Sequence, residues 1–352
     1  MTVKLNDKVI FIRSAFLGDF LVCLPVINQI IRDNNLTKNN IYFLIINNSG
    51  ANPINAIFGD DHIFSKNSIV FNTHKYLESL WKCFKFFKMV SHERKLIYLP
   101  MWYDSFKGQI LKYVTFKFIF GLNKHIYGIF KQNSENRKVV SQYLNPFVVL
   151  GLEFNTSYNC LDLFGMPAIS INNKNRPFLI YPYSKLKMKI WPSEKYVNLI
   201  NKIIETYNPD IFLIGGKDDY EYNQTIKNHF LKNDKIQNIA GTLSVKQTIE
   251  LMLRSEVFIG NDGFPMHLAA IANLPIIGIF TYKNPLGCWD PIIVDKMITV
   301  RTDTKCKLCY LAECDNPICI LKTSEEIIFN KLQKLLISNV PIKEINVNFC
   351  NQ

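Results

Sequence analysis

The sequence predicts an α/β protein built from two doubly wound domains. Short and almost wholly apolar runs recur along the chain, at residues 9–12, 41–46, 96–99, 178–181, 211–214, 257–259 and 276–280. Helical stretches separate these runs, and this alternation is typical of parallel sheets with both faces covered. The series restarts after Pro177, and 352 residues suffice for two domains that each bury a core.

Composition narrows the class of protein. The chain is 48% apolar, 20% charged and 13% aromatic, which excludes a disordered chain. The apolar N-terminal run is interrupted by Arg13 and Asp19 and has no small-residue cleavage site, so we expect no secretory signal. The longest uncharged run, 263–282, contains two prolines and is a poor membrane span. We therefore expect a cytoplasmic protein.

The first domain is expected to begin with a strand over 9–12. Residues 18–31 follow as a loop that enters a helix, and Asp19 lies where this helix starts. A carboxylate in this place has two interpretations. It stabilises the helix N-terminus, or it faces a ligand at the carboxyl end of the strand and accepts a proton. The polar segment 170–176 is the expected linker to the second domain.

The second domain is expected to open with a strand over 178–181 and a helix that starts at Ser193. Lys189 lies between them and is one of three lysines in residues 185–189. It is therefore either part of a solvated basic run or a cation held beside a helix N-terminus. The second arrangement suits a diphosphate.

A tight turn follows the strand over 257–259. Residues 260–263 form this turn, and Pro265 begins the next helix, whose first turn holds Met266 and His267. Free N–H groups at such a helix start suit a phosphate or a ribose oxygen. The histidine is either structural, bonded to nearby backbone, or in contact with a ligand.

These three segments, in this order and spacing, resemble glycosyltransferase family 9, which is typified by the ADP-heptose:lipopolysaccharide heptosyltransferases. Residues 14–25 are similar to the family's Ser-Leu-Gly-Asp loop and Leu-Pro pair. Residues 189–194 resemble its Lys-x-Trp-Pro-x-Glu segment, and 260–269 resemble its Gly-Asn-Asp-Thr-Gly-Pro-Met-His-Leu-Ala segment. Two further stretches, 280–291 and the cysteine-rich 306–327, also resemble the family, so the likeness covers nearly the whole chain.

The resemblance implies the GT-B fold, in which two doubly wound Rossmann-like domains face a central cleft. Residues 1–172 are then the acceptor-binding domain, 173–325 the nucleotide-sugar-binding domain, and 326–352 a C-terminal helix and tail. The implied enzyme is an inverting glycosyltransferase that moves heptose from ADP-heptose onto a lipopolysaccharide core or a related surface glycan. Within the family, the alternative is another nucleotide-sugar or a protein acceptor.

Inverting transfer requires a base for the incoming hydroxyl and stabilisation of the departing diphosphate. Asp19 is the expected base. We expect no catalytic metal or other catalytic cofactor, because Lys189 and backbone dipoles supply the positive charge. The residues expected to bind the donor are Ser184, Lys189, Asp262, Gly263, Met266 and His267.

The chain departs from the family pattern in the donor segment. The family's Asp-Thr-Gly is Asp262-Gly263-Phe264 here, so a threonine hydroxyl is absent and a phenyl ring replaces a glycine. Contacts made through the backbone can persist, whereas contacts made through that hydroxyl cannot. The identity of the donor sugar therefore stays open.

Four of the nine cysteines lie close together, at Cys306, Cys309, Cys314 and Cys319. In a cytosolic protein, such a cluster favours a metal site over a set of disulfides. Thiolates at this spacing can close a tetrahedron around zinc or iron, and a metal bound in this way is structural. Four reduced cysteines without a ligand are the alternative.

Basic and aromatic side chains concentrate in residues 75–124. The stretch carries ten basic and three acidic side chains, and helices with lysines among aromatic residues are expected over 80–89 and 106–120. Either the aromatic rings pack inward, or these helices lie on an anionic membrane surface, here the inner membrane. The same composition suits single-stranded nucleic acid. Since no RNA-binding motif accompanies it, we expect no nucleic-acid partner and keep a non-enzymatic nucleic-acid-binding protein as a distant alternative.

Overall fold

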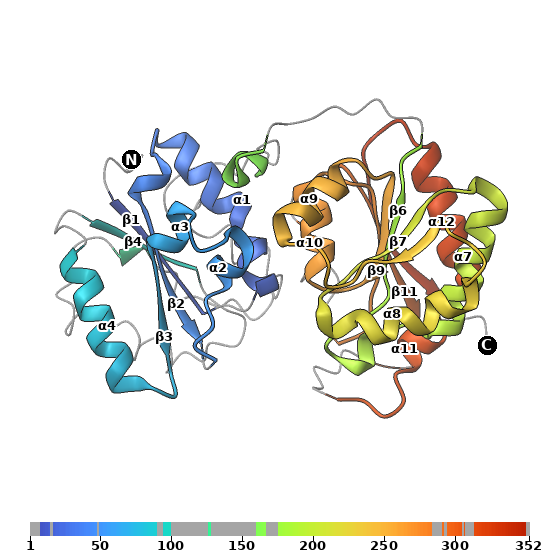
Figure 1. The fold of residues 1–352 in the computed structure, drawn as a ribbon, viewed down its shortest axis with the longest axis horizontal. Coiled ribbons are helices and arrows are strands. Elements are labelled where there is room, and N and C mark those ends of the chain that lie inside the picture. The colour runs from blue at the N-terminus through green and yellow to red at the C-terminus, as the bar shows by residue number, and fades with distance from the viewer. Residues whose placement is uncertain are drawn as a thin grey trace. The chain divides into compact units, whose positions relative to one another are not determined.

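The computed structural model describes residues 8–14, 17–47, 49–89, 94–99, 126–127, 160–166, 175–283, 291, 294–304, 306 and 313–349. Two compact units, Met1–Phe164 and Gly165–Gln352, make up the chain. Each unit contains one sheet, and Figure 1 shows helices beside both sheets. Most of the predicted linker, 170–176, lies outside the described residues, so the domain boundary at residue 172 stays a prediction.

The first unit is built on a five-stranded parallel sheet with the order β3-β2-β1-β4-β5. The direction in which the chain adds strands therefore reverses between β1 and β4, and doubly wound sheets bind ligands beyond the carboxyl ends of the strands at such a point. The strands predicted at 9–12, 41–46 and 96–99 are confirmed. The strands are β1 Lys8–Ser14, β2 Ile41–Asn47, β3 Ser68–Asn72, β4 Arg94–Leu99 and β5 Ile126–Tyr127.

Helix α1, Leu17–Asp33, follows β1 and packs on the sheet. Its apolar side chains recur at helical spacing, and Leu24 and Ile27 are completely buried. The ring of Phe20 meets Phe43 of β2 edge to face, with 5.5 Å between ring centroids. The predicted helix after the first strand is thereby confirmed, and its first residue precedes Gly18.

Helix α4, Tyr76–Met89, lies on the opposite face of this sheet. Its Phe86 contacts the ring of Tyr42, whose side chain points away from that of its neighbour Phe43. The predicted helix over 80–89 is confirmed as part of α4, whereas residues 106–120 lie outside the described residues. Three short helices accompany them: η1 Lys38–Asn40, α2 Pro53–Phe58 and α3 Ile63–Lys66.

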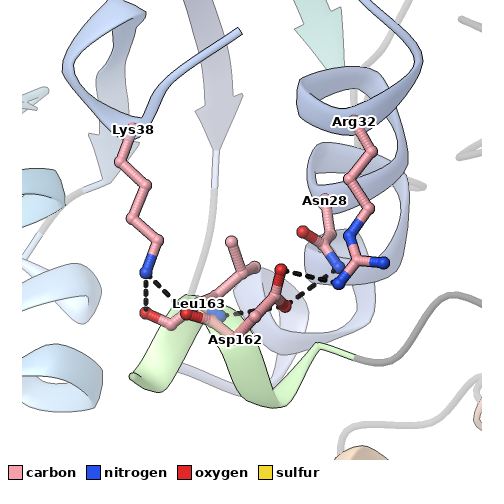
Figure 2. A network of polar contacts seen from close by, with 5 residues as sticks. All are labelled: Asn28, Arg32, Lys38, Asp162 and Leu163. Carbon is pink, nitrogen blue, oxygen red and sulfur yellow. Dashed lines mark hydrogen bonds and ion pairs between the residues drawn. The ribbon is translucent and has the colours of Figure 1, made fainter. Parts of the chain in front are cut away.

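A polar network around Asp162 holds the helical turn η3, Leu161–Phe164, against the rest of the first unit (Figure 2). The carboxylate of Asp162 accepts hydrogen bonds from Arg32 at 2.8 Å and from Asn28 at 3.3 Å, both on α1. The ammonium of Lys38 donates to two backbone carbonyl oxygens of the same turn, at 2.6 and 3.2 Å. The network therefore fixes the last segment of the first unit to the helix that follows its first strand.

The second unit is built on a seven-stranded parallel sheet with the order β12-β11-β10-β9-β6-β7-β8. Its direction of winding reverses between β6 and β9. The strands predicted at 178–181, 211–214, 257–259 and 276–280 are confirmed as β6, β7, β9 and β10. The strands are β6 Phe178–Tyr181, β7 Ile211–Leu213, β8 Ile236–Asn238, β9 Val257–Asn261, β10 Ile276–Ile279, β11 Lys296–Asp303 and β12 Ile342–Phe349.

Helices cover both faces of this sheet. They are η4 Lys187–Lys189, α7 Ser193–Tyr207, η5 Lys217–Asp219, α8 Tyr220–Lys227, η6 Asn228–Phe230, α9 Val245–Leu253, α10 Phe264–Ile271, α11 Ile318–Leu321 and α12 Glu325–Ile337. Figure 1 shows α7 and α12 on one side of the sheet and α9 and α10 on the other. The predicted C-terminal helix is confirmed as α12, and its Leu332 and Leu335 are completely buried in the core of the second unit.

Within the residues that the structure describes, no helix has both the length and the apolar composition needed to cross a membrane.

Candidate active site

The loops that follow β6 and β9 meet at the switch point of the second sheet. The two strands are neighbours, and Tyr181 at the end of β6 pairs with Gly260 in β9. Lys189 belongs to the first loop and Asp262 to the second, and their side chains meet although they lie 73 positions apart. Two segments that the sequence singled out separately thus form one site, at the edge where such sheets bind ligands.

Lys189 and Asp262 form an ion pair. The ammonium of Lys189 donates a hydrogen bond to Oδ2 of Asp262, and the two side chains are only 13% and 9% exposed. The turn η4 holds Lys189 in place, because its N–H donates to the carbonyl oxygen of Leu186 at 2.8 Å. Each charge would be costly in this shielded place without the other. Together they offer a cation for an anionic oxygen and a carboxylate for hydroxyl groups.

His267 joins this pair. It lies in α10 and is 7% exposed. Its pKa is lowered to about 4, chiefly by burial; the charge of Asp262 opposes this shift and that of Lys189 adds to it. The imidazole is therefore neutral at pH 7, so it can donate one hydrogen bond and accept another without adding charge. The structure thus brings together three of the predicted donor-binding residues.

Gly263 is the N-cap of α10, and its backbone is extended, with φ −170°. Its carbonyl oxygen accepts a hydrogen bond from the N–H of Met266 at 3.2 Å. The side chain of Met266 is completely buried, and a Cβ added at Gly278 of β10 would lie 3.3 Å from its sulfur. Met266 therefore packs its side chain against the sheet, and its predicted contact with the donor stays a prediction.

A buried hydrogen-bond network ties the two loops together. The hydroxyl of Tyr196 donates to the side-chain oxygen of Asn261 at 3.1 Å and lies 3.3 Å from the carbonyl oxygen of Tyr181. The amide of Asn261 donates to the carbonyl oxygen of Pro182 at 2.7 Å. Both side chains are completely buried. The sequence analysis missed this scaffold, for which the Gly-Asn-Asp turn was the one available signal.

Trp191 anchors the far end of the Lys189 loop. Its ring is completely buried and meets Tyr196 edge to face, with 4.7 Å between centroids. Its indole N–H donates to the carbonyl oxygen of Thr323 at 2.9 Å. The loop that carries Lys189 is thus fastened at the start of α7 and at the segment that leads into α12, so the position of the ammonium does not depend on the ion pair alone.

Two further residues lie in or near these loops. Ser184, predicted to contact the donor, is in the loop after β6 and is 5% exposed. Asp219, which the sequence indicates as a solvated or helix-starting residue, is 6% exposed and accepts a hydrogen bond from the N–H of Gly216 at 2.7 Å. Burial raises its pKa, whereas that hydrogen bond and the charge of Lys185 lower it. Asp219 therefore shapes the turn after β7.

Asp19 is the third residue of α1 and follows β1, the strand at the switch point of the first sheet. Both interpretations of this carboxylate agree with such a place, because the start of a helix and the carboxyl end of a strand coincide there. Its role as a base stays a prediction.

The cysteine segment is described in part. Cys306 and Cys314 are half-buried, Cys319 is buried in α11, and Cys309 lies outside the described residues. Among the residues that are described, no three Cys, His, Asp or Glu side chains gather closely enough to hold a metal ion. A structural metal that uses all four thiolates stays a prediction.

The part of the chain that contains this site is similar in sequence to known proteins. Residues 148–319 match the family model of glycosyltransferase family 9 (heptosyltransferase). The lipopolysaccharide core heptosyltransferase OpsX of Haemophilus influenzae is 30% identical over 132 residues, which are 38% of this chain and 37% of that protein. Lipopolysaccharide heptosyltransferase 1 of Campylobacter coli is 31% identical over 172 residues, 47% of each chain. The matches thus span less than half the length of these relatives.

Solved structures with low sequence identity share the fold. The glycosyl transferase family 9 protein of Veillonella parvula has a TM-score of 0.65 at 14% identity, covering 96% of this chain and 99% of its own. ADP-heptose lps heptosyltransferase II of E. coli has a TM-score of 0.60 at 14% identity, covering 94% and 98%. With the two parallel sheets, these likenesses confirm the predicted GT-B fold class. Lys189, Asp262 and His267 thus lie in the part of the chain that matches the model of glycosyltransferase family 9.

Proposed function

We propose that this chain is an inverting glycosyltransferase that moves a sugar, heptose from ADP-heptose, onto a lipopolysaccharide core or a related surface glycan. The observation that carries the proposal is the shielded ion pair of Lys189 and Asp262, with neutral His267 beside it at the start of α10. The site lies in the part of the chain that matches the family 9 model, and two relatives are named as lipopolysaccharide heptosyltransferases.

The proposed reaction is a single displacement at the anomeric carbon of the donor sugar. The acceptor hydroxyl forms the new C–O bond while Asp19 takes its proton. The bond to the diphosphate breaks on the opposite side, the configuration inverts, and the nucleoside diphosphate leaves. Lys189 and the N-terminus of α10 stabilise the negative charge that grows on this leaving group. Asp262 accepts hydrogen bonds from sugar or ribose hydroxyls.

Another nucleotide-sugar or a protein acceptor is the second candidate. Gly263 and Phe264 favour it, because they stand where the family has threonine and glycine, directly beside Asp262. The match to a transferase family favours an enzyme over a nucleic-acid-binding protein.

We further propose that the protein works in the cytoplasm on the inner face of the membrane and attaches there through α4. Leu77, Trp81 and Phe84 are 82%, 60% and 48% exposed on this helix. The rings of Trp81 and Phe84 stack with 6.0 Å between centroids, and Nζ of Lys85 lies 5.2 Å from the centre of the Trp81 ring. Exposed aromatic rings with lysines beside them suit the interface of an anionic membrane, where a lipid-linked acceptor is found.

The proposal is tested by supplying nucleotide-sugars and truncated lipopolysaccharide cores and following the acceptor by mass spectrometry. We expect the acceptor to gain one heptose from ADP-heptose at a rate that EDTA does not change. Asp19→Asn keeps the size of the side chain but removes the base, so transfer should fall roughly 10²–10⁴-fold. Nucleotide binding, measured by calorimetry, should persist in this variant. Transfer by Asp19→Asn at the wild-type rate would place the base elsewhere, and a protein that binds and transfers no nucleotide-sugar would contradict the proposed function.

A further inference from the structure

Tyr181 occupies the space beside the start of α10. It is the last residue of β6 and pairs with Gly260. A Cβ added at Gly260 would lie 2.6 Å from the carbonyl oxygen of Tyr181, and one added at Gly263 would lie 2.8 Å from its ring atom Cε1. The ring therefore runs along the Asp262 turn and packs directly on Gly263. Because the φ of Gly263 is −170°, any residue can adopt this backbone, and glycine is needed here for space.

The hydroxyl end of this ring lies at the N-cap of α10. The position of a Cβ on Gly263 is 3.4 Å from the Tyr181 hydroxyl oxygen. This oxygen thus lies in van der Waals contact with the place where the family's threonine side chain would begin. Gly263, which stands where the family has threonine, leaves room for the ring of Tyr181. The ring in turn brings a hydroxyl to the place where the threonine hydroxyl is absent.

The side chain of Tyr181 is largely buried, and its hydroxyl remains a donor. Tyr181 is 5% exposed, and burial, with Asp219, Tyr183 and Asp262 nearby, raises its pKa, so the O–H keeps its proton. Across the described residues, no hydrogen bond of the Tyr181 hydroxyl is found. An oxygen of a ligand at the helix start would supply the acceptor that this hydroxyl lacks.

We propose that the Tyr181 hydroxyl donates a hydrogen bond to a diphosphate oxygen of the nucleotide-sugar at the N-terminus of α10. An anionic oxygen is the matching acceptor, because the helix dipole and the ammonium of Lys189 favour negative charge in the same place. Tyr181 is then a donor-binding residue particular to this chain. The inference rests on the proposed function, since it requires a nucleoside diphosphate in this site.

The test compares nucleotide binding by wild type and Tyr181→Phe in calorimetry, with ADP, UDP and GDP as probes. A hydrogen bond to a charged oxygen is worth about 1.5–3 kcal/mol, so Tyr181→Phe should bind the preferred diphosphate roughly 10–100-fold more weakly. Binding of the matching nucleoside should be unchanged, and so should the melting temperature. The control is Tyr207→Phe, which removes a hydroxyl from the exposed end of α7.

The outcomes separate the two proposals. If wild type binds none of the diphosphates, the proposed function fails. If wild type binds and Tyr181→Phe binds equally well, the function stands and the role of Tyr181 is refuted. An equal loss for the nucleoside would move the contact away from the diphosphate and overturn the inference as well.

A double-mutant cycle tests the role of Gly263. Gly263→Ala places a methyl group against the ring and should weaken diphosphate binding in the wild-type background. In a Tyr181→Ala background the same change meets open space and should have little effect. Additive losses in a folded double variant would contradict the packing of Tyr181 on Gly263. If Tyr181→Ala does not fold, the comparison with Tyr181→Phe still decides the inference.

Discussion

Lys189 and Asp262 stabilise each other before any ligand arrives. Both side chains are largely buried, so removing one leaves the other as an uncompensated charge, at a cost of about 3–5 kcal/mol. We expect Lys189→Ala to lower the free energy of unfolding and also to weaken nucleotide binding. Adding Asp262→Asn should recover stability but not binding, because the ammonium is still missing. Denaturant unfolding and calorimetry measure the two effects separately.

Lys187→Ala is the matched control for this experiment. Lys187 belongs to the same turn but is exposed, and its loss should change neither quantity. If Lys187→Ala weakens binding and Lys189→Ala does not, the phosphate site lies on the other side of η4.

His267 makes stability depend on pH. Its pKa in the folded protein is about 4, below the value near 6.5 of an unfolded histidine. The unfolded chain therefore binds more protons between these pH values, and stability is fully present above pH 6.5 and is lost as the pH falls towards 4. Between pH 7 and 4.5 the loss should be on the order of 2 kcal/mol. Urea unfolding at several pH values measures it, and His267→Gln should flatten the slope; an unchanged slope would show that other groups cause it.

The membrane proposal depends on a single element, helix α4. Replacing both Trp81 and Phe84 by alanine removes the stacked, exposed rings of α4 while keeping its charges. We expect this variant to lose most of its co-sedimentation with vesicles that contain anionic lipid. The double variant Leu231→Ala and Leu243→Ala removes apolar surface at exposed positions of the other unit and serves as the control. Equal binding by all three proteins would show that α4 does not carry the attachment.

The elements that the sequence predicted are those with a continuous apolar signal. The runs at 9–12 and 178–181 lie in central strands, and all four residues of the second run are buried, which favours apolar residues at every position. Four of the five described strands that were missed, β3, β5, β8 and β12, lie at the edge of a sheet. Of the three side chains of β8, only Ile236 is buried. Edge strands contact water, and their polar residues resemble those of loops.

The sequence predicted the individual residues of the site, but not that they lie together. The sequence indicated Lys189, Asp262 and His267 one by one, because each follows a strand or begins a helix. Their meeting depends on the order of strands, which places β6 next to β9, and no spacing in the sequence encodes that order. Tyr196 could not be predicted, since a buried hydroxyl on a helix has the same spacing as the apolar residues around it.

At the scale of the molecule, the cysteine segment links the sheet of the second unit to its last helices. If Cys306, Cys309, Cys314 and Cys319 hold a metal, purified protein should contain about one zinc or iron per chain, since four thiolates make one tetrahedral site. Chelation should then lower the melting temperature, because structural metal binding is coupled to folding. Elemental analysis and thermal unfolding with and without chelator measure this. Metal-free protein of unchanged stability would leave the four cysteines as reduced thiols.

The Asp162 network also decides where this gene can be divided. Its partners Asn28, Arg32 and Lys38 all belong to the first unit, so residues 160–164 belong with that unit even though they come directly before the second one. A first half that stops before Cys160 would expose the surface of α1 that now contacts the carboxylate and would lose the partner of Arg32. Separate expression of the two halves therefore calls for a cut after Phe164, where the first unit ends.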